Sequence, residues 1–591
     1  MPTREVFRAM RRFRWALTIP ACCFAFVLHA AEPTERERTL PRPSWAWGVL
    51  GLRNIDGTLA QLARYCDRAA TNSGALVRLS LSTLLFPVPL EDGLKKDGPA
   101  VIFFLDPGQA GGRKDEKALL LPVSDPALLK ESLEAVFGAT MQENRLQVSV
   151  PRGFTEPDAT LLIRLAPGGL LVAPNAQILK ELETLAGGKD ASQFVAADGP
   201  DAVAELNFEA LRRIERKRLD DFMERTFKAT ALAAPSAAGQ VEDGQQRLQK
   251  FLRELDRLEV HARIEAKEIR LASRLRALAD TELAQRWDRA PDAPAGTWNS
   301  WCGAETALFV TGRFPAAWAC PEKDTAAWLA RYLPADSAAG QAAQAACART
   351  LSAWLGQLDG DLACAVQVDA EGAFFPLTLF GAKNDADVLA AFDAFLAPAA
   401  TSLAERLRAD FKLPADQPLP AVLEKMPDGP TGVVRHTLKF QEAKVEAWAR
   451  ERLGAVGGWP PEFCARRATG GLVLGWGRGA ETCVAAEPVA RGAGAALFPE
   501  PPEGTAGCAL LHPVAAMRVF LRQWCHLDEA ATRRVLDGLA NTPLSAFWGQ
   551  GDGAVQLELR VPVESLRTAL EGYLRMLKEG FDPDAKPATE Q

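Results

Sequence analysis

Residues 551–578 read GDGAVQLELRVPVESLRTALEGYLRMLK, and this stretch decides the fold class. After the turn residues at 551–553, positions 555, 557, 559 and 561 are apolar and the positions between them are mostly polar. This alternation predicts a strand with one buried face. The apolar positions then change to a helical period, at Leu566, Leu570, Tyr573, Leu574 and Leu577. The stretch therefore predicts a tight turn, a strand and an amphipathic helix that follows directly.

The same hairpin-plus-helix (ββα) pattern recurs at residues 258–287 and 362–396. Another copy ends at Ser124-Asp125-Pro126, where Asp125 is the expected helix cap and Pro126 the first helical residue. A second pattern, a strand that runs straight into a helix, covers residues 45–69, 202–228, 306–332 and 509–524. Hairpins with one apolar face need helices to cover that face. We therefore predict an α+β fold of repeated antiparallel ββα units, with sheets covered by helices.

Two halves of similar plan are a further interpretation of the pattern. Residues 168–172, GGLLV, precede a predicted helix and are echoed by residues 470–474, GGLVL. The halves would span residues 45–290 and 296–578. Residues 207–257 break the rhythm with two amphipathic helical stretches, and we interpret them as a helical insert in the first half. The last residues, 579–591, are expected to form a disordered tail.

The N-terminus has the features of a cleaved secretory signal peptide at residues 1–31. Five arginines between residues 4 and 14 precede an apolar stretch at residues 15–28, and small residues follow at 30 and 31. Residues 32–44 are expected to be a linker. No later apolar run reaches the ~20 residues of a spanning helix. We therefore expect a periplasmic or extracellular protein with no transmembrane span in the mature chain.

The bulk composition excludes several classes of function. The net charge of −7 gives no basic surface for nucleic acid. The histidines show no i, i+4 zinc spacing, and neither a phosphate-binding loop nor a nucleophile elbow occurs. Residues 475–480, GWGRGA, fit a dinucleotide-binding pattern, but a glycine-containing turn explains them better. We predict no catalytic, cofactor-binding or metal-binding residues and no cofactor.

The cysteines give the clearest local signal. Of eleven cysteines, eight lie between residues 302 and 525, and no C-x-x-C occurs, which argues against a zinc ribbon or a thioredoxin-type site. In an exported protein disulfides are the natural interpretation, with ordinary buried thiols as the alternative. Helix-to-strand packing favours two of the pairs, 508/525 and 347/364. Taken in chain order, the expected pairs are Cys302 with Cys320, Cys347 with Cys364, Cys464 with Cys483, and Cys508 with Cys525.

The signal peptide, the serial ββα units and the lack of catalytic motifs resemble the large uncharacterised exported proteins of bacterial genomes, known as domains of unknown function. The resemblance covers most of the mature chain in pattern. It has no diagnostic motif and assigns no functional residue.

Three functions fit these features. The first is a non-catalytic protein of the cell envelope that binds another macromolecule or acts as a scaffold. The second is a carrier of an apolar ligand, and the third is a hydrolase with dispersed carboxylates. A large exposed apolar patch would favour the first, an enclosed apolar cavity the second, and a cleft with convergent carboxylates the third.

We predict that the mature chain begins near Ala31 or Glu32, because signal peptidase cuts after small residues that follow an apolar run. The intact mass of the natively secreted protein measures this directly. Recovery of a membrane-bound form that retains Met1 would instead indicate an uncleaved anchor.

Overall fold

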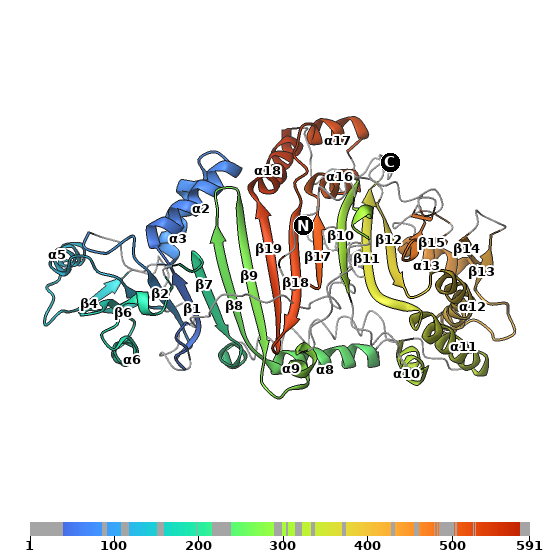
Figure 1. Ribbon diagram of the computed structural model, residues 1–591, viewed down its shortest axis with the longest axis horizontal. Coiled ribbons are helices and arrows are strands. Elements are labelled where there is room, and N and C mark those ends of the chain that lie inside the picture. Colours follow the sequence, from blue (N-terminus) through green and yellow to red (C-terminus); the bar gives the residue numbers. More distant parts are fainter. Residues whose placement is uncertain are drawn as a thin grey trace.

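A computed structural model describes part of the chain, in which strands and helices combine in a mixed α+β fold. The strands form one antiparallel sheet of 19 strands (Figure 1). The predicted signal peptide, most of the linker, the tail and Cys320 lie outside the described residues. The described residues are 40–578 except 86–91, 108–116, 151–158, 197, 215–237, 289–297, 303–304, 314–321, 333–336, 369–373, 427–431, 454–458, 460, 478, 481–482, 484–501, 503–504, 524 and 526.

The first nine strands build one side of the sheet. Every neighbouring pair among them is antiparallel. From the outer edge inward they are β4 (Arg145–Val150), β5 (Ala159–Ala166), β6 (Gly169–Ala173), β3 (Lys117–Leu121), β2 (Ala100–Leu105), β1 (Ala46–Leu52), β7 (Ala202–Asn207), β8 (Leu255–Ile264) and β9 (Glu268–Ala277).

The remaining ten strands continue the sheet from β9, whose other neighbour is β19, the last strand of the chain. The last strand of the chain therefore lies in the middle of the sheet (Figure 1). Continuing outward, the strands are β19 (Ala554–Pro562), β18 (Leu544–Gly551), β17 (Gly507–Leu511), β10 (Thr306–Arg313), β11 (Leu358–Val368), β12 (Phe374–Ala382), β16 (Gly471–Trp476), β15 (Glu462–Ala468), β14 (Val433–Phe440) and β13 (Ala421–Lys425).

Several helices begin where the sequence predicts. Asp125 Oδ1 accepts hydrogen bonds of 3.0 Å from the amides of Ala127 and Leu128, ahead of Pro126 at the first helical turn. The helices are α2 (Ile55–Ala69), α3 (Ser73–Leu85), α5 (Pro126–Phe137), α6 (Ala176–Ala186), α8 (Ala238–Glu254), α9 (Glu282–Trp287), α10 (Glu322–Tyr332), α11 (Ala338–Leu355), α12 (Asp385–Asp410), α13 (Ala443–Leu453), α16 (Pro513–Gln523), α17 (Glu529–Leu536) and α18 (Val563–Lys578). Strand β8 begins at Leu255, inside the segment 207–257 that the sequence suggested was helical.

The outer parts of the sheet are covered on both faces. On the N-terminal side, α5 packs with Ile102 and Leu119 on one face, while α6 packs with Phe103 and Leu120 on the other. On the C-terminal side, α11 and α12 close over Leu472, with Trp354 stacked on Phe395 at 5.7 Å between ring centroids. The covering of both faces explains why β2, β3 and β6 are nearly continuous apolar runs.

The turn, strand and helix in residues 551–578 form as predicted, but the helix buries the face opposite to the predicted one. Asp552 and Gly553 take the left-handed conformation of a tight turn between β18 and β19. Helix α18 follows at once, yet its apolar stripe faces outward, with Tyr573 53% and Leu574 49% exposed. The opposite face is buried, because Gly572 lets α18 approach Met517 of α16 closely. Small residues, rather than the apolar stripe, decide which face packs.

Helix α12 is the one helix in the described part of the chain that is long and apolar enough to span a membrane by length and composition. The expectation of no such helix rested on uninterrupted apolar runs, and α12 contains charged residues and Pro398. Its hydropathy comes largely from alanine. In the structure it packs on α11 and on strands β13, β15 and β16.

The glycines that open strands β6 and β16 have no room for a side chain. A Cβ on Gly169, which opens β6, would lie 2.3 Å from the carbonyl oxygen of Leu121 in β3. A Cβ on Gly471, which opens β16, would lie 1.9 Å from the carbonyl oxygen of Phe380 in β12. The GG echo in the sequence therefore marks two places where a glycine lets the backbones of neighbouring strands approach closely.

We predict that Gly169→Ala and Gly471→Ala each lower the free energy of unfolding by about 1–3 kcal/mol, because a backbone carbonyl must move to admit the methyl group. Urea unfolding of the full chain measures the loss. Gly551→Ala is the matched control, since nothing lies within 4 Å of its Cβ position. A loss at Gly551 as large as at the other two would contradict the close-approach argument.

Candidate functional site

The central strands β7, β8, β9, β19 and β18 present two chemically different faces. Side chains alternate between the faces of a strand, and the registers place like positions beside each other. One face is apolar and the other carries most of the charge. We call them the apolar face and the charged face.

The apolar face continues across the middle of the sheet without interruption by charge. One row joins Ala262 of β8, Leu271 of β9 and Leu559 of β19, and the registers carry it on to Ala546 of β18. The next row contains the one hydroxyl residue of the central three strands, Ser273. The face is formed by Ala202, Ala204, Leu206, Leu258, Val260, Ala262, Leu271, Ser273, Leu275, Ala546, Trp548, Leu557 and Leu559.

Helices cover the two ends of the apolar face. At one end, Tyr65 and Ala69 of α2 pack with Ile264, Ile269 and Val563 at the start of α18. The Tyr65 hydroxyl also donates a 2.9 Å hydrogen bond to the carbonyl of residue 561. At the other end, residues of α8 and α9 pack with the opposite ends of the same strands. Figure 1 shows α2 and α18 along the upper ends of these strands and α8 and α9 along the lower ends.

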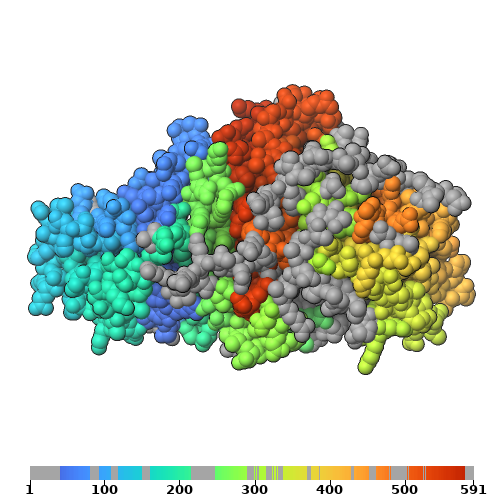
Figure 2. Space-filling model, viewed as in Figure 1, coloured from blue at the N-terminus to red at the C-terminus, as the bar shows by residue number. Residues whose placement is uncertain are grey.

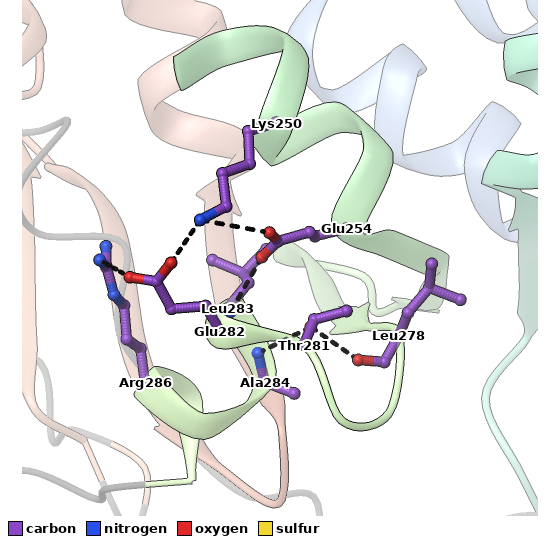
Figure 3. A network of polar contacts seen from close by, with 8 residues as sticks. All are labelled: Lys250, Glu254, Leu278, Thr281, Glu282, Leu283, Ala284 and Arg286. Carbon is purple, nitrogen blue, oxygen red and sulfur yellow. Dashed lines mark hydrogen bonds and ion pairs between the residues drawn. The ribbon is translucent and has the colours of Figure 1, made fainter. Parts of the chain in front are cut away.

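A polar network fixes α9 against α8 at the lower end (Figure 3). Lys250 and Arg286 both pair with the Glu282 carboxylate, which these hydrogen bonds hold at a lowered pKa. Glu254 accepts a 2.9 Å hydrogen bond from the amide of Leu283, and Thr281 caps α9 through the amide of Ala284. The network ties the helices to each other and leaves the sheet between the two ends unobstructed by them.

The middle of the apolar face keeps contact with solvent. Val260, Ala262, Leu271, Leu557 and Leu559 are all half-buried, in contrast to strands β3 and β6, whose residues are almost all buried. In the space-filling view the N-terminal half occupies one side of the molecule, and the red C-terminal strands lie beside the green β8–β9 segment in the centre (Figure 2). Contiguous apolar surface marks a binding site when it is large and exposed, and this row is the candidate for such a surface.

The charged face holds a buried ion network at β7 and β8. Glu205 and Glu259 lie directly opposite each other, 6% and 8% exposed. Arg42, from the segment before β1, pairs with Glu205 and reaches Glu259 at 3.8 Å. Arg257 Nε lies 2.7 Å from the Glu259 carboxylate. Burial raises the pKa of Glu205 to about 7, although Arg42 acts against this shift.

This network has the two carboxylates of an acid–base pair, but its geometry points to structure. Both carboxylates are held by guanidinium groups that stabilise their ionised forms. They are also nearly closed off from solvent, so no side of the pair is presented to a substrate. The described part of the chain contains no cluster of His, Cys, Asp and Glu residues suited to a metal ion.

Two buried histidines have partners. His436 Nε2 lies 2.8 Å from Asp393 Oδ1, and Lys425 pairs with the same carboxylate. His512 Nε2 lies 3.5 Å from Cys302 Sγ. Burial lowers the pKa of His512 and raises that of Cys302 to about 12, so this pair is a neutral imidazole beside a neutral thiol. A nucleophilic cysteine would require the thiolate.

The cysteines do not form the expected disulfides. All eight described cysteines are free thiols, so the pairs 347/364, 464/483 and 508/525 are not bonded, and Cys320 of the pair 302/320 lies outside the described residues. Cys464 and Cys483 are nonetheless brought together, and their hydrogen bond together with burial raises the pKa of Cys483. Cys525 Sγ instead lies 3.7 Å from Met576 Sδ. The prediction for Cys508 and Cys525 failed because α16 packs mainly on β10, α17 and α18 instead of lying back along its own strand β17.

The sequence correctly predicted the apolar face of β8, but it did not predict the ion network on the charged face. The apolar positions 258, 260, 262 and 264 do share a face. The charges of Arg257 and Glu259 alternate with them and were visible in the sequence. Their role in the ion network depends on β7 and on Arg42, which lie far away in the chain and contact them only in the folded sheet.

Comparisons with known proteins give no relative. No protein-family model matches the chain, and no match is found among curated proteins or solved structures. The site must therefore be judged on its own chemistry.

We predict that Glu205 makes stability depend on pH near neutrality. Its folded pKa of about 7 is raised above the value of a free carboxyl, so its contribution is complete at low pH and is lost as the pH rises through 7. Thermal unfolding from pH 5 to 8 should show this fall in the wild type, and Glu205→Gln should flatten it. Asp552→Asn, at a carboxylate 67% exposed, is the control and should leave the slope unchanged. A slope that survives in Glu205→Gln would contradict the assignment.

Proposed function

We propose that this chain is a non-catalytic protein of the cell envelope that binds an apolar surface of another macromolecule, an envelope protein, on its central apolar face. The observation that carries the proposal is the row of half-buried aliphatic side chains across β8, β9 and β19. The signal-peptide pattern of residues 1–31 supports the location, which is periplasmic or extracellular.

The shape of the face supports a macromolecule over a small ligand. Five neighbouring strands span about 20 Å at the usual strand spacing. Within the described part of the chain, the helices that contact these strands lie at the two ends of the face, whereas carriers of small apolar ligands bury most of the ligand surface in a cavity. An apolar surface of this width fits another macromolecule better than a small ligand.

Helices α18 and α3 add further apolar surface at the upper end of the face. Leu566, Leu574 and Leu577 of α18 are 41–49% exposed, and Leu76 of α3 is 69% exposed. Both helices contact α2, so this surface adjoins one end of the apolar face. A partner seated on the sheet could extend onto these helices.

The carrier of an apolar ligand is the second candidate, because the same aliphatic rows could hold acyl chains. The two candidates differ in the mass of what becomes attached to the face. The carboxylate network gives no support to the hydrolase, since its oxygens are engaged by arginines.

We predict that a photo-crosslinking amino acid at position 559 captures the partner in the envelope fraction, and that the same probe at position 558 does not. The two positions are adjacent in β19 and point to opposite faces of the sheet. Gel shift and mass spectrometry of the adducts give the readout. A protein-sized adduct supports the proposal and a lipid-sized adduct supports the carrier. Equal capture from both positions, or none from 559, would refute both.

A further inference from the structure

The two sides of the sheet have the same strand connectivity. From the middle outward, the N-terminal side runs β9, β8, β7, β1, β2, β3, β6, β5, β4. The C-terminal side runs β19, β18, β17, β10, β11, β12, β16, β15, β14, with β13 added at the edge. Each strand of the N-terminal side thus has a counterpart at the same place on the C-terminal side, including the non-sequential step from β3 to β6 and from β12 to β16.

The residue-by-residue pairing of neighbouring strands also agrees between the two sides of the sheet. Starting from the matched pair Gly169 and Gly471, we followed the registers strand by strand toward the middle. Leu121 then matches Phe380, and Val49 matches Phe309. When the registers are followed further, through β7 and β8 on one side and β17 and β18 on the other, Ala272 of β9 matches Glu558 of β19.

Ala272 and Glu558 are each other's partners in the β9–β19 ladder. This result is a check on the matching, because a slip of one residue in any strand would leave no residue of β9 matched to its own ladder partner. It also means that Arg274, opposite Gln556, matches Arg560, opposite Arg270.

We infer that the chain is a fused pseudo-dimer: two copies of one unit joined edge to edge, with a twofold axis through the Ala272–Glu558 pair. The seam between β9 and β19 is then an interface between two folding units, and the partner that fits the β9 edge is a second copy of the unit. This inference does not rest on the proposed function, because it uses only strand order and register.

The matching separates what both units share from what one unit has alone. The apolar face is shared, since Leu271 matches Leu557 across the axis. The ion network is not shared, because Glu205 and Glu259 match Leu510 and Ser545. The apolar face thus belongs to the common unit, and the charged network was gained or kept by the N-terminal copy only.

The seam can be tested by cutting the chain between the two units. A protease site is inserted within residues 289–297, and the folded full-length protein is cut there. The two fragments should elute together at the size of the uncut chain and keep its far-ultraviolet circular dichroism. The unfolding midpoint of the cut protein should fall on dilution, while that of the uncut protein should not.

A matched pair of substitutions locates the interface on the axis. In the cut protein, Leu271→Asp places a carboxylate in the apolar row of the seam, opposite Leu559, and should weaken association about tenfold, whereas Leu76→Asp, on the exposed surface of α3, should not weaken it. Loss of the sheet signal on cutting, or a midpoint independent of concentration, would overturn the inference of two units. Equal dissociation constants for the two variants would overturn the position of the axis.

Discussion

The ladder between β9 and β19 is the interaction on which the rest of the structure depends. It joins nine strands to ten, and it pairs residues 268–276 with residues 554–562, which lie about half the chain length away. Without it, each side would end in a long unpaired edge with apolar side chains on one face, which is a template for aggregation. With it, the sheet has only β4 and β13 at its ends.

The charge pattern around this ladder follows from its position. Directly opposed arginines, such as Arg270 and Arg560, repel each other. Each also has a carboxylate two residues away in its own strand, Glu268 for Arg270 and Glu558 for Arg560. The Arg560 guanidinium further lies 4.7 Å from the ring centroid of Phe547. Local pairing within each strand thus compensates for repulsion between strands.

Local patterns in the sequence foretold local structure well. The alternation in residues 555–561, the Asp125–Pro126 helix start and the GG echo all appear where expected, because each depends on neighbours in the chain. Predictions that required one element to find a distant one failed or were missing. The outward stripe of α18 depends on Gly572 meeting Met517, and the disulfide pairs depended on how helices sit on strands. The Glu205 network likewise needs three segments that only the complete sheet brings together.

The position of β19 at the end of the chain has a consequence for how the protein is made. When β9 has been synthesised, its neighbour on the open side is still the last strand to come. At about 5–20 residues per second, that wait lasts roughly a quarter of a minute to a minute. For this time the first unit holds an unsatisfied strand edge beside its half-buried leucines, the same features that make partly folded chains stick together. A nascent chain of this design would be most vulnerable while residues up to β9 are complete and β19 is not, and a holding chaperone would protect it best at the β9 edge.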